Sequence, residues 1–325
     1  MTVSGFPLLM AFGQGRSQVI ALPQPTEKPA TFAFEQLRDG IRQYYREIKA
    51  IEVEYEQTTD VVSAEPGDEH VIPRAMHRFA SRGEKRLCCG SYPPRGKAGA
   101  TLELGSTHAF NGDYYQVYTP AEKTGFIARS KDPFVDSDAY MRALAIPVSD
   151  RDGSFVSRTE YFFPYVLDHA DFEWKVSPKL EIVDGAECHV LESKFRQRIR
   201  VDPRIGYAMR FRERYWPVKD RPANQLPLGV RNLFSSYRQL ADGIRLPQRI
   251  DSVQYTSPSL PENLWNRVRF VVVRQAAKLA INEQVEDSLF TLSFPSGTVV
   301  TDTIRNRAYR IGSANEELDV IVEKG

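Results

Sequence analysis

The sequence predicts a mainly β protein: a strongly curved antiparallel half-barrel, arranged as a meander, with an N-terminal helix and short helices inserted as a plug or lid. Asn-Gly or Asp-Gly pairs separate strand-like runs at 111–112, 184–185 and 242–243, and such pairs are the strongest short hairpin signal. Successive short hairpins make neighbouring strands antiparallel, unlike the long crossovers of a doubly wound sheet. Sheets twist, so a meander of this length must curl and bury one face of every strand.

The first 30 residues are predicted to precede the domain, and residues 31–325 to form it. The stretch from Phe6 to Phe12 is apolar, but no Lys or Arg precedes it. It is either the remnant of a signal segment or a disordered lead, and the Pro-rich stretch "ALPQPTEKPA" favours the first because such spacers follow cleavage sites. No other segment approaches the ~20 apolar residues that a membrane span needs, so no membrane span is predicted.

The domain is predicted to begin with a helix that passes directly into a strand. Apolar residues recur at steps of three and four, which is typical of an amphipathic helix, at Phe34, Leu37, Ile41, Tyr44, Tyr45 and Ile48. From Ile51 the step becomes two, with Val53 and Tyr55 following. Glu52, Glu54 and Glu56 fall between them, so they share one strand face, where solvated charge is favoured over a metal or acid–base site.

Hairpins then continue to the C-terminus. Further turns are predicted at 82–83, at 202–206 and around Asn282, and Phe290, Leu292 and Phe294 alternate with polar residues in a last strand that ends at Pro295 and Gly297. Two aromatic stretches, 132–147 and 161–174, are predicted to be the inserted short helices. Residues 217–229 form a long loop, and the hairpin pattern is the same on both of its sides, which indicates a single domain.

Composition and motifs exclude several kinds of function. The net charge is +1, from 43 basic and 42 acidic residues, so no overall field attracts nucleic acid or an anionic membrane. The sequence contains no Gly-rich phosphate loop, no Gly-x-Ser-x-Gly elbow, no His-x-x-x-His and no Cys-x-x-Cys. We therefore predict no catalytic residue, no metal and no cofactor. Cys88, Cys89 and Cys188 are interpreted as small buried side chains, and pairing of Cys188 with Cys88 or Cys89 stays open.

Two local clusters allow an alternative function. Asp168, His169 and Asp171 lie close together with Glu173, as a hydrolase would need, although an ordinary solvated loop is favoured. Arginines alternate with apolar residues through 195–216, superficially like a nucleic-acid surface. Alternation places them on an outer face, where Glu192, Asp202 and Glu213 can neutralise part of their charge; these arginines are Arg196, Arg198, Arg200, Arg210 and Arg212.

The order of these elements resembles the LolA-like family of lipoprotein-localisation factors, of which this chain would be an enlarged member. The helix-to-strand stretch "YYREIKAIEVEYEQTTD" resembles the opening of that family. The closing stretch "INEQVEDSLFTLSFPSGTVVTD" is similar to its end, with these residues in step: Asn282, Asp287, Phe290, Leu292, Pro295, Gly297 and Asp302. "DGIRLPQRIDSVQY" resembles a family hairpin through Gly243, Pro247 and Ile250, and "VDPRIGYAMRFRERY" resembles the strand pair before it. The lid arginine of the family has no identifiable counterpart.

The resemblance implies an incomplete barrel whose open side is plugged by helices around a cavity for acyl chains. We expect a non-enzymatic carrier or binding protein of the periplasm or cell envelope, which holds a lipid acyl chain or a lipid-modified polypeptide and can meet an envelope protein partner. The apolar faces of the predicted strands supply the candidate wall: Tyr55, Phe79, Tyr115, Met209, Phe211, Phe270, Phe290 and Leu292. Two alternatives stay open: a protein-interaction or structural module with a filled core, and the hydrolase above.

Overall fold

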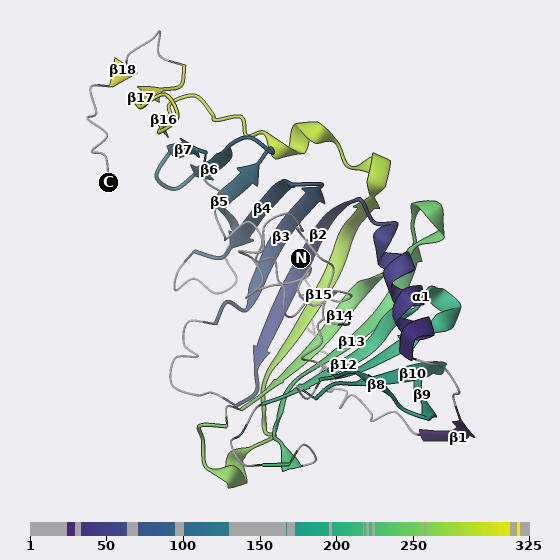
Figure 1. The fold of residues 1–325 in the computed structure, drawn as a ribbon. Coiled ribbons are helices and arrows are strands. Elements are labelled where there is room, and N and C mark those ends of the chain that lie inside the picture. Colours follow the sequence, from purple (N-terminus) through teal and green to yellow (C-terminus); the bar gives the residue numbers. More distant parts are fainter. Residues whose placement is uncertain are drawn as a thin grey trace, which may run out of the picture.

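The computed structural model describes residues 25–29, 34–63, 71–94, 101–129, 167, 173–194, 197–216, 218, 221–222, 225–256, 258–312 and 317–318. Within them the chain folds into one long, curved sheet and a single α-helix (Figure 1). The predicted inserted helices at 132–147 and 161–174 lie outside the described residues, except for Leu167 and the two residues at the end of the second stretch.

The first half of the sheet follows the helix. Helix α1 (Phe34–Arg46) leads into β2 (Ala50–Val61), close to the predicted boundary. The next strands are β3 (Arg74–Arg82), β4 (Lys85–Tyr92), β5 (Glu103–Phe110), β6 (Tyr115–Thr119) and β7 (Thr124–Ala128). Each pairs antiparallel with the one before it, as a meander requires.

The second half repeats this plan. Its strands are β8 (Lys175–Val176), β9 (Lys179–Val183), β10 (Ala186–Glu192), β11 (Gln197–Asp202), β12 (Ala208–Tyr215), β13 (Leu228–Gln239), β14 (Arg245–Tyr255) and β15 (Val268–Ile281). Strand β15 then pairs antiparallel with β2, from Ile281 opposite Ile51 to Phe270 opposite Val61. The two meanders therefore join along their longest strands.

The last strands extend one edge of the sheet. Strand β16 (Val299–Asp302) pairs parallel with β7, and β17 (Arg307–Arg310) and β18 (Glu317–Leu318) follow outward. At the other edge β1 (Pro25–Pro29) pairs with β9, although it falls within the segment predicted to be a lead. In the described part of the chain no pairing joins β18 to β1, so the sheet stays open, and the predicted half-barrel is confirmed.

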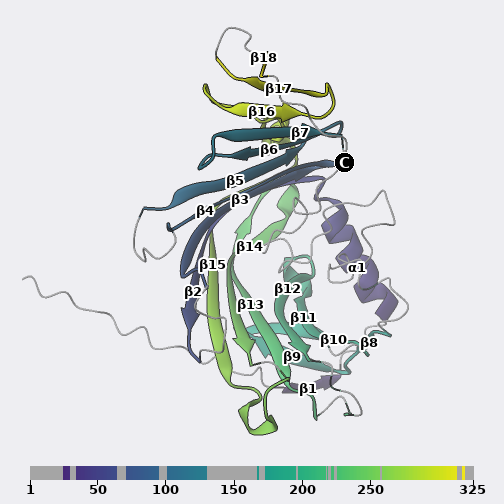
Figure 2. The same cartoon turned by 90° about the vertical axis from the view of Figure 1, so that its left-hand side faces the viewer.

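Curvature gives the sheet an inner and an outer face. The strands bend around α1, which stands across the open side (Figure 2). We call the face that packs against α1 the inner face and the opposite one the outer face. Irregular pairing occurs near Arg200, near Ala276 and near Cys89, and such bulges bend strands and increase their twist.

Local turn chemistry explains the hairpins. Gly112, Gly185 and Gly243 have positive φ values of 103°, 70° and 74°, in the region that glycine adopts without steric cost. The turns predicted at these three positions are therefore present. Asn282 also has a positive φ, 55°. Its side-chain amide donates to the carbonyl of Glu47 and accepts from the backbone of Lys49 and Ala50, which ties the end of β15 to the junction between α1 and β2.

Candidate functional site: the inner face of the half-barrel

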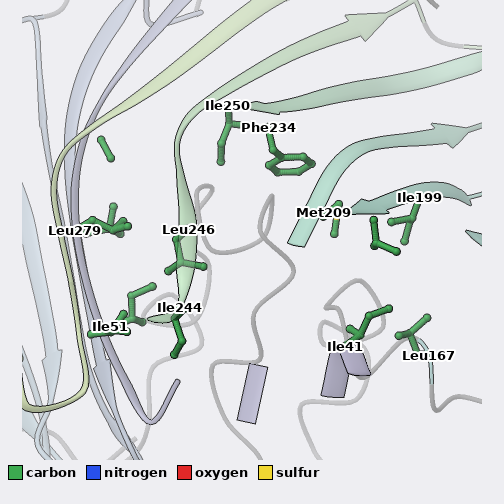
Figure 3. Close-up of a cluster of buried hydrophobic side chains, with 14 of the residues drawn as sticks. Ile41, Ile51, Leu167, Ile199, Met209, Phe234, Ile244, Leu246, Ile250 and Leu279 are labelled. Atoms are coloured by element: carbon green, nitrogen blue, oxygen red, sulfur yellow. The ribbon is translucent and has the colours of Figure 1, made fainter. Parts of the chain in front are cut away.

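The inner face carries the largest apolar cluster among the described residues, which we call the main cluster (Figure 3). Its strand residues come from both meanders: Ile51, Val53, Tyr55, Phe79, Leu191, Ile199, Val201, Met209, Phe234, Ile244, Leu246, Ile250, Ala276, Leu279 and Ile281. Alternation along each strand turns these side chains to one side. The sheet thus presents a continuous apolar surface toward α1.

Helix α1 covers this surface. Leu37 and Ile41 are completely buried in the main cluster, and Ile41 lies beside Leu167 in Figure 3. Gly40 is required where the helix meets the sheet, because an added Cβ would lie 2.4 Å from the ring of Tyr207. Trp174 is also buried in the main cluster. In this structure the apolar surface is therefore filled by side chains of the protein itself.

A tyrosine fastens the helix to β14. The Tyr44 hydroxyl accepts a hydrogen bond from the backbone N–H of Arg245 and donates to its carbonyl oxygen. Burial raises the pKa of Tyr44 to about 12, although the hydrogen bond from Arg245 acts in the opposite direction. The hydroxyl is thus protonated at neutral pH, as a group that must donate has to be.

A row of polar side chains borders the main cluster on the inner face. We call Gln197, Arg212, Asn232, Ser252 and Arg274 the polar row, and all five are buried. Register places them: Arg212 is opposite Ile199 and Asn232, Asn232 is opposite Ser252, and Arg274 is opposite Ile250. Residues directly opposite one another share a face, so the polar row and the main cluster line the same concavity.

Hydrogen bonds link the polar row across strands. Arg274 donates to the Ser252 hydroxyl at 3.0 Å, and this hydroxyl donates to Asn232 Oδ1 at 2.7 Å. Arg212 donates to Gln197 Oε1 at 2.9 Å. Burial, and secondly the neighbouring Arg214 guanidinium, lower the pKa of Arg212 to about 10, so Arg212 stays charged at neutral pH. The row therefore brings positive charge into a buried concavity.

Five of the eight predicted wall residues lie on the inner face. Tyr55, Phe79 and Met209 belong to the main cluster. Tyr115 is buried in a separate small cluster with Phe110. Phe270 is half-buried opposite Val61, with the Arg269 guanidinium 4.7 Å from its ring centre, at the end of β2 that lies away from α1.

The other three lie on the outer face, so the structure does not bring the eight together around one hollow. Phe211 packs with Val183, Ala186 and Cys188. Phe290 and Leu292 pack against Ala50, Ala80, Leu87 and Ala109, which alternate with inner residues such as Ile51 and Phe79. The assignment of these three to an inner wall is corrected by their position.

The predicted strand through Phe290, Leu292 and Phe294 is wrong. Residues Asp287–Phe290 form a 3-10 helix, and the following segment crosses the outer face without a strand partner. Gln116 holds this segment, since its side chain accepts from the Leu292 N–H at 2.9 Å and donates to the Leu292 carbonyl at 3.3 Å. Phe294 then lies over Gly125, beside Tyr118. The side chains of this segment do alternate, but the segment packs against the face of the sheet instead of pairing with it as a strand.

Arginines on the outer face are paired with carboxylates, as predicted for this sequence stretch. Arg200 is buried between Glu181, at 2.8 Å, and Glu213, at 2.7 Å. Arg198 bonds to Glu181 and Glu192, and Arg231 to Glu213. Arg210 bonds to Asp202. These ion pairs offset part of the positive charge of the outer face. Two arginines differ from the prediction: Arg200 is buried rather than solvated, and Arg212 lies on the inner face.

Other candidate chemistry is sparse. Asp168, His169 and Asp171 lie outside the described residues, as does Arg196. Where the structure describes the chain, no group of three metal-ligating side chains occurs, and no disulfide joins the three cysteines. Glu52, predicted to be solvated, is buried, with ion pairs to Arg78 and Lys278. A pocket of about 350 Å³ on α1 is lined by polar residues: Asp39, Arg42, Gln43 and Glu47.

Sequence reasoning missed the polar row. Asn232 and Ser252 fall within runs whose alternation is weak, and nothing in the sequence marks the pairing irregularity between Arg200 and Val201 that turns Arg212 inward.

No helix in the described ranges is long and apolar enough to cross a membrane.

Comparison with known proteins gave structural similarity only. No family model and no curated protein matches the sequence. A DUF1329 family protein from Desulfovibrio piger is similar, with 14% identity and a TM-score of 0.45 over 79% of this chain and 95% of the other. A putative outer membrane lipoprotein-sorting protein domain from Vibrio parahaemolyticus has 13% identity and a TM-score of 0.44, over 80% and 97%. A LolA superfamily protein from Nitrosomonas europaea has 12% identity and a TM-score of 0.41, over 80% and 98%.

Proposed function

We propose that this protein binds the acyl chain of a lipid, or of a lipid-modified polypeptide, on the inner face of the half-barrel. It acts without catalysis, as a carrier or binding protein of the periplasm or cell envelope. The observation that supports this is the apolar surface of the main cluster, which spans both meanders and packs against α1. A surface of this kind binds hydrocarbon by exclusion of water and needs no reactive group.

The apolar contribution of a chain is of the same order as that of the helix. Full burial of Leu37 and Ile41 contributes roughly 3–6 kcal/mol together, at 1.5–3 kcal/mol for each side chain. The hydrogen bonds of Tyr44 add about 1–3 kcal/mol, and Phe34 and Ile48 add further apolar contact. A twelve-carbon chain transferred from water gains roughly 10 kcal/mol, at about 0.8 kcal/mol for each methylene. Exchange of α1 for a chain on the main cluster is thus the step that this proposal requires.

A matched pair of substitutions tests this proposal. Ala276 lies in the main cluster and Ala109 lies under Phe290 on the outer face, and both are buried. Phenylalanine at either position overpacks its site and costs about 1–3 kcal/mol of stability. We expect Ala276→Phe to weaken binding of cis-parinaric acid, measured by its fluorescence, about tenfold or more, and Ala109→Phe to leave binding by the folded fraction unchanged.

Native mass spectrometry of protein purified without detergent provides the second readout. Lipid that copurifies, or added parinaric acid that binds with a defined stoichiometry, agrees with the proposal. Protein that neither carries nor accepts any chain contradicts it.

The alternative is an interaction module with the same fold and a filled core. The observation that favours it is the complete burial of Leu37, Ile41, Tyr55 and Phe79 with α1 in place. On this alternative the protein would meet an envelope partner through its loops. This function would be supported over that of a lipid carrier if Ala276→Phe and Ala109→Phe bound parinaric acid equally, at the level of a non-binding reference protein.

A further inference from the structure

We propose that the polar row limits the length of the acyl chain that the inner face binds, so that the protein selects chains of medium length. This inference rests on the proposed function and narrows its ligand. It depends on the place of the polar row in the concavity, at the border of the main cluster, and on the polarity of its five buried side chains.

The polar row crosses the concavity from strand to strand. Arg212 on β12 is opposite Asn232 on β13, which is opposite Ser252 on β14. Arg274 on β15 follows with a step of two residues along the strand, and it donates to the Ser252 hydroxyl at 3.0 Å. Gln57 on β2 is opposite Arg274 and continues the row. A chain that follows any of these five strands from the end where α1 joins the sheet therefore meets a polar side chain.

The inner face is apolar between that end of the sheet and the polar row. On β2 the main cluster runs from Ile51 to Tyr55, and on β15 it runs from Ile281 to Ala276. Strands rise about 3.4 Å per residue, so these two runs are about 14 and 17 Å long. A saturated chain advances about 1.3 Å per carbon, because its bonds of about 1.5 Å form a zigzag, and about 11 to 13 carbons therefore span either run.

Beyond the polar row the inner face is mixed in polarity. Arg214 is opposite Val230, Val230 is opposite Gln254, and Gln254 is opposite Phe270. Polar and apolar side chains thus alternate across the strands at this level. A methylene that lies there displaces water from polar as well as apolar groups, so it contributes less to binding than a methylene on the main cluster.

Hydrogen bonds hold the polar row in place as a border. The Ser252 hydroxyl links Arg274 to Asn232, and Arg212 donates to Gln197 at 2.9 Å. A chain could pass only if these side chains moved aside, and a buried polar group that loses its hydrogen bond is costly. The length of chain that gains from burial is thus set where the main cluster meets the row.

A homologous series of ligands tests this limit. Saturated fatty acids share one headgroup and differ only in length, and their displacement of cis-parinaric acid, below their critical micelle concentrations, gives dissociation constants with the full chain. From about 8 to about 12 carbons we expect each methylene to tighten binding about fourfold. Beyond about 14 carbons we expect less than about twofold for each methylene.

Two variants move the limit in opposite directions. Ser252→Ala with Arg274→Met removes the centre of the polar row, and we expect the steep gain to continue for about four more carbons, since one layer of the row is about 7 Å deep. Ile250→Thr adds a hydroxyl opposite Arg274, one layer nearer to α1, and should end the steep gain at least about two carbons earlier. The matched control is Asp251→Ala with Arg249→Met, which removes an ion pair of the outer face and should leave the length profile unchanged.

Each failure has its own signature. Affinity that rises at one rate up to the longest acid overturns the length limit and leaves acyl-chain binding intact. A limit that stays at the same length in the folded inner-face variants shows that the polar row is not the border, and this also overturns the proposal. If Ser252→Ala with Arg274→Met does not fold, as judged by circular dichroism, Ile250→Thr decides. Protein that binds neither parinaric acid nor any fatty acid contradicts the proposed function itself.

Discussion

Replacement of Phe290 by alanine tests whether the segment that crosses the outer face is part of the folded core. The Phe290 ring is completely buried. Three alanines, Ala50, Ala80 and Ala109, form much of its surroundings together with Leu87, and their short side chains leave the depth that the ring fills. Phe→Ala substitutions in cores cost about 3–5 kcal/mol, the sum of lost transfer free energy and of the cavity left behind.

Chemical denaturation measures this cost. With a urea dependence near 3 kcal/mol per molar, a loss of 3–5 kcal/mol lowers the unfolding midpoint by roughly 1 to 2 M. Phe294→Ala is the matched control, because Phe294 is half-buried and lies further along the same segment over Gly125, so we expect less than half of the loss. Binding of parinaric acid by the folded fraction should be unchanged in both variants. A cost below about 1 kcal/mol for Phe290→Ala, or one equal to that of Phe294→Ala, refutes the view that this ring anchors the segment.

Two further predictions concern titratable groups. Burial disfavours the Glu213 carboxylate, but Arg200 and Arg231 outweigh this effect and lower the pKa of Glu213. The stability that ionised Glu213 contributes is thus present above the ordinary pKa of 4.5 and is lost as the pH falls below that value. Glu213→Gln should cost about 3–5 kcal/mol near neutral pH, since it leaves Arg200 buried without one partner, and should flatten the acid limb of a stability–pH curve from urea unfolding; an unchanged acid limb contradicts this. Burial raises the pKa of Tyr44 to about 12, so its contribution is present below the ordinary value of 10 and lost as pH rises toward 12. Tyr44→Phe should cost about 1–3 kcal/mol and flatten the alkaline limb, whereas an equal loss at every pH would place the effect elsewhere than in the bonds to Arg245.

Local chemistry made much of the fold predictable. The change from a period of three or four to a period of two between Ile48 and Ile51 marks the end of α1 and the start of β2, because helices and strands present side chains at these two spacings. The Asp-Gly and Asn-Gly pairs marked hairpins, because their positive φ values are needed within the turn itself. Signals of this kind are contained in a few consecutive residues, so they can be recognised in the sequence alone.

Pairing between distant segments carries no such signal. Strand β15 meets β2, and β16 meets β7 in parallel, across long stretches of chain. The alternation of Phe290, Leu292 and Phe294 indicates that one side of the segment packs against apolar residues. It does not indicate whether the backbone of the segment forms hydrogen bonds with a neighbouring strand or with a single side chain, because an extended segment has a period of two in both cases. Here Gln116 provides both of the bonds to Leu292, a solution that depends on the folded sheet.

The candidate site depends on one extra residue. Arg200 is opposite Phe211 and Val201 is opposite Met209, so Arg210 is left between two pairs. Because side chains alternate with a period of two, one unpaired residue moves every side chain beyond it to the opposite face of the sheet. Met209 therefore lies in the main cluster while Phe211 lies outside, and the arginines divide in the same way: Arg200 joins the carboxylates of the outer face and Arg212 enters the concavity. A sequence with strict alternation through 208–215 would keep the charge on Arg212 outside, and the inner face would be apolar there. The bulge thus decides which face of β12 carries the Arg212 guanidinium.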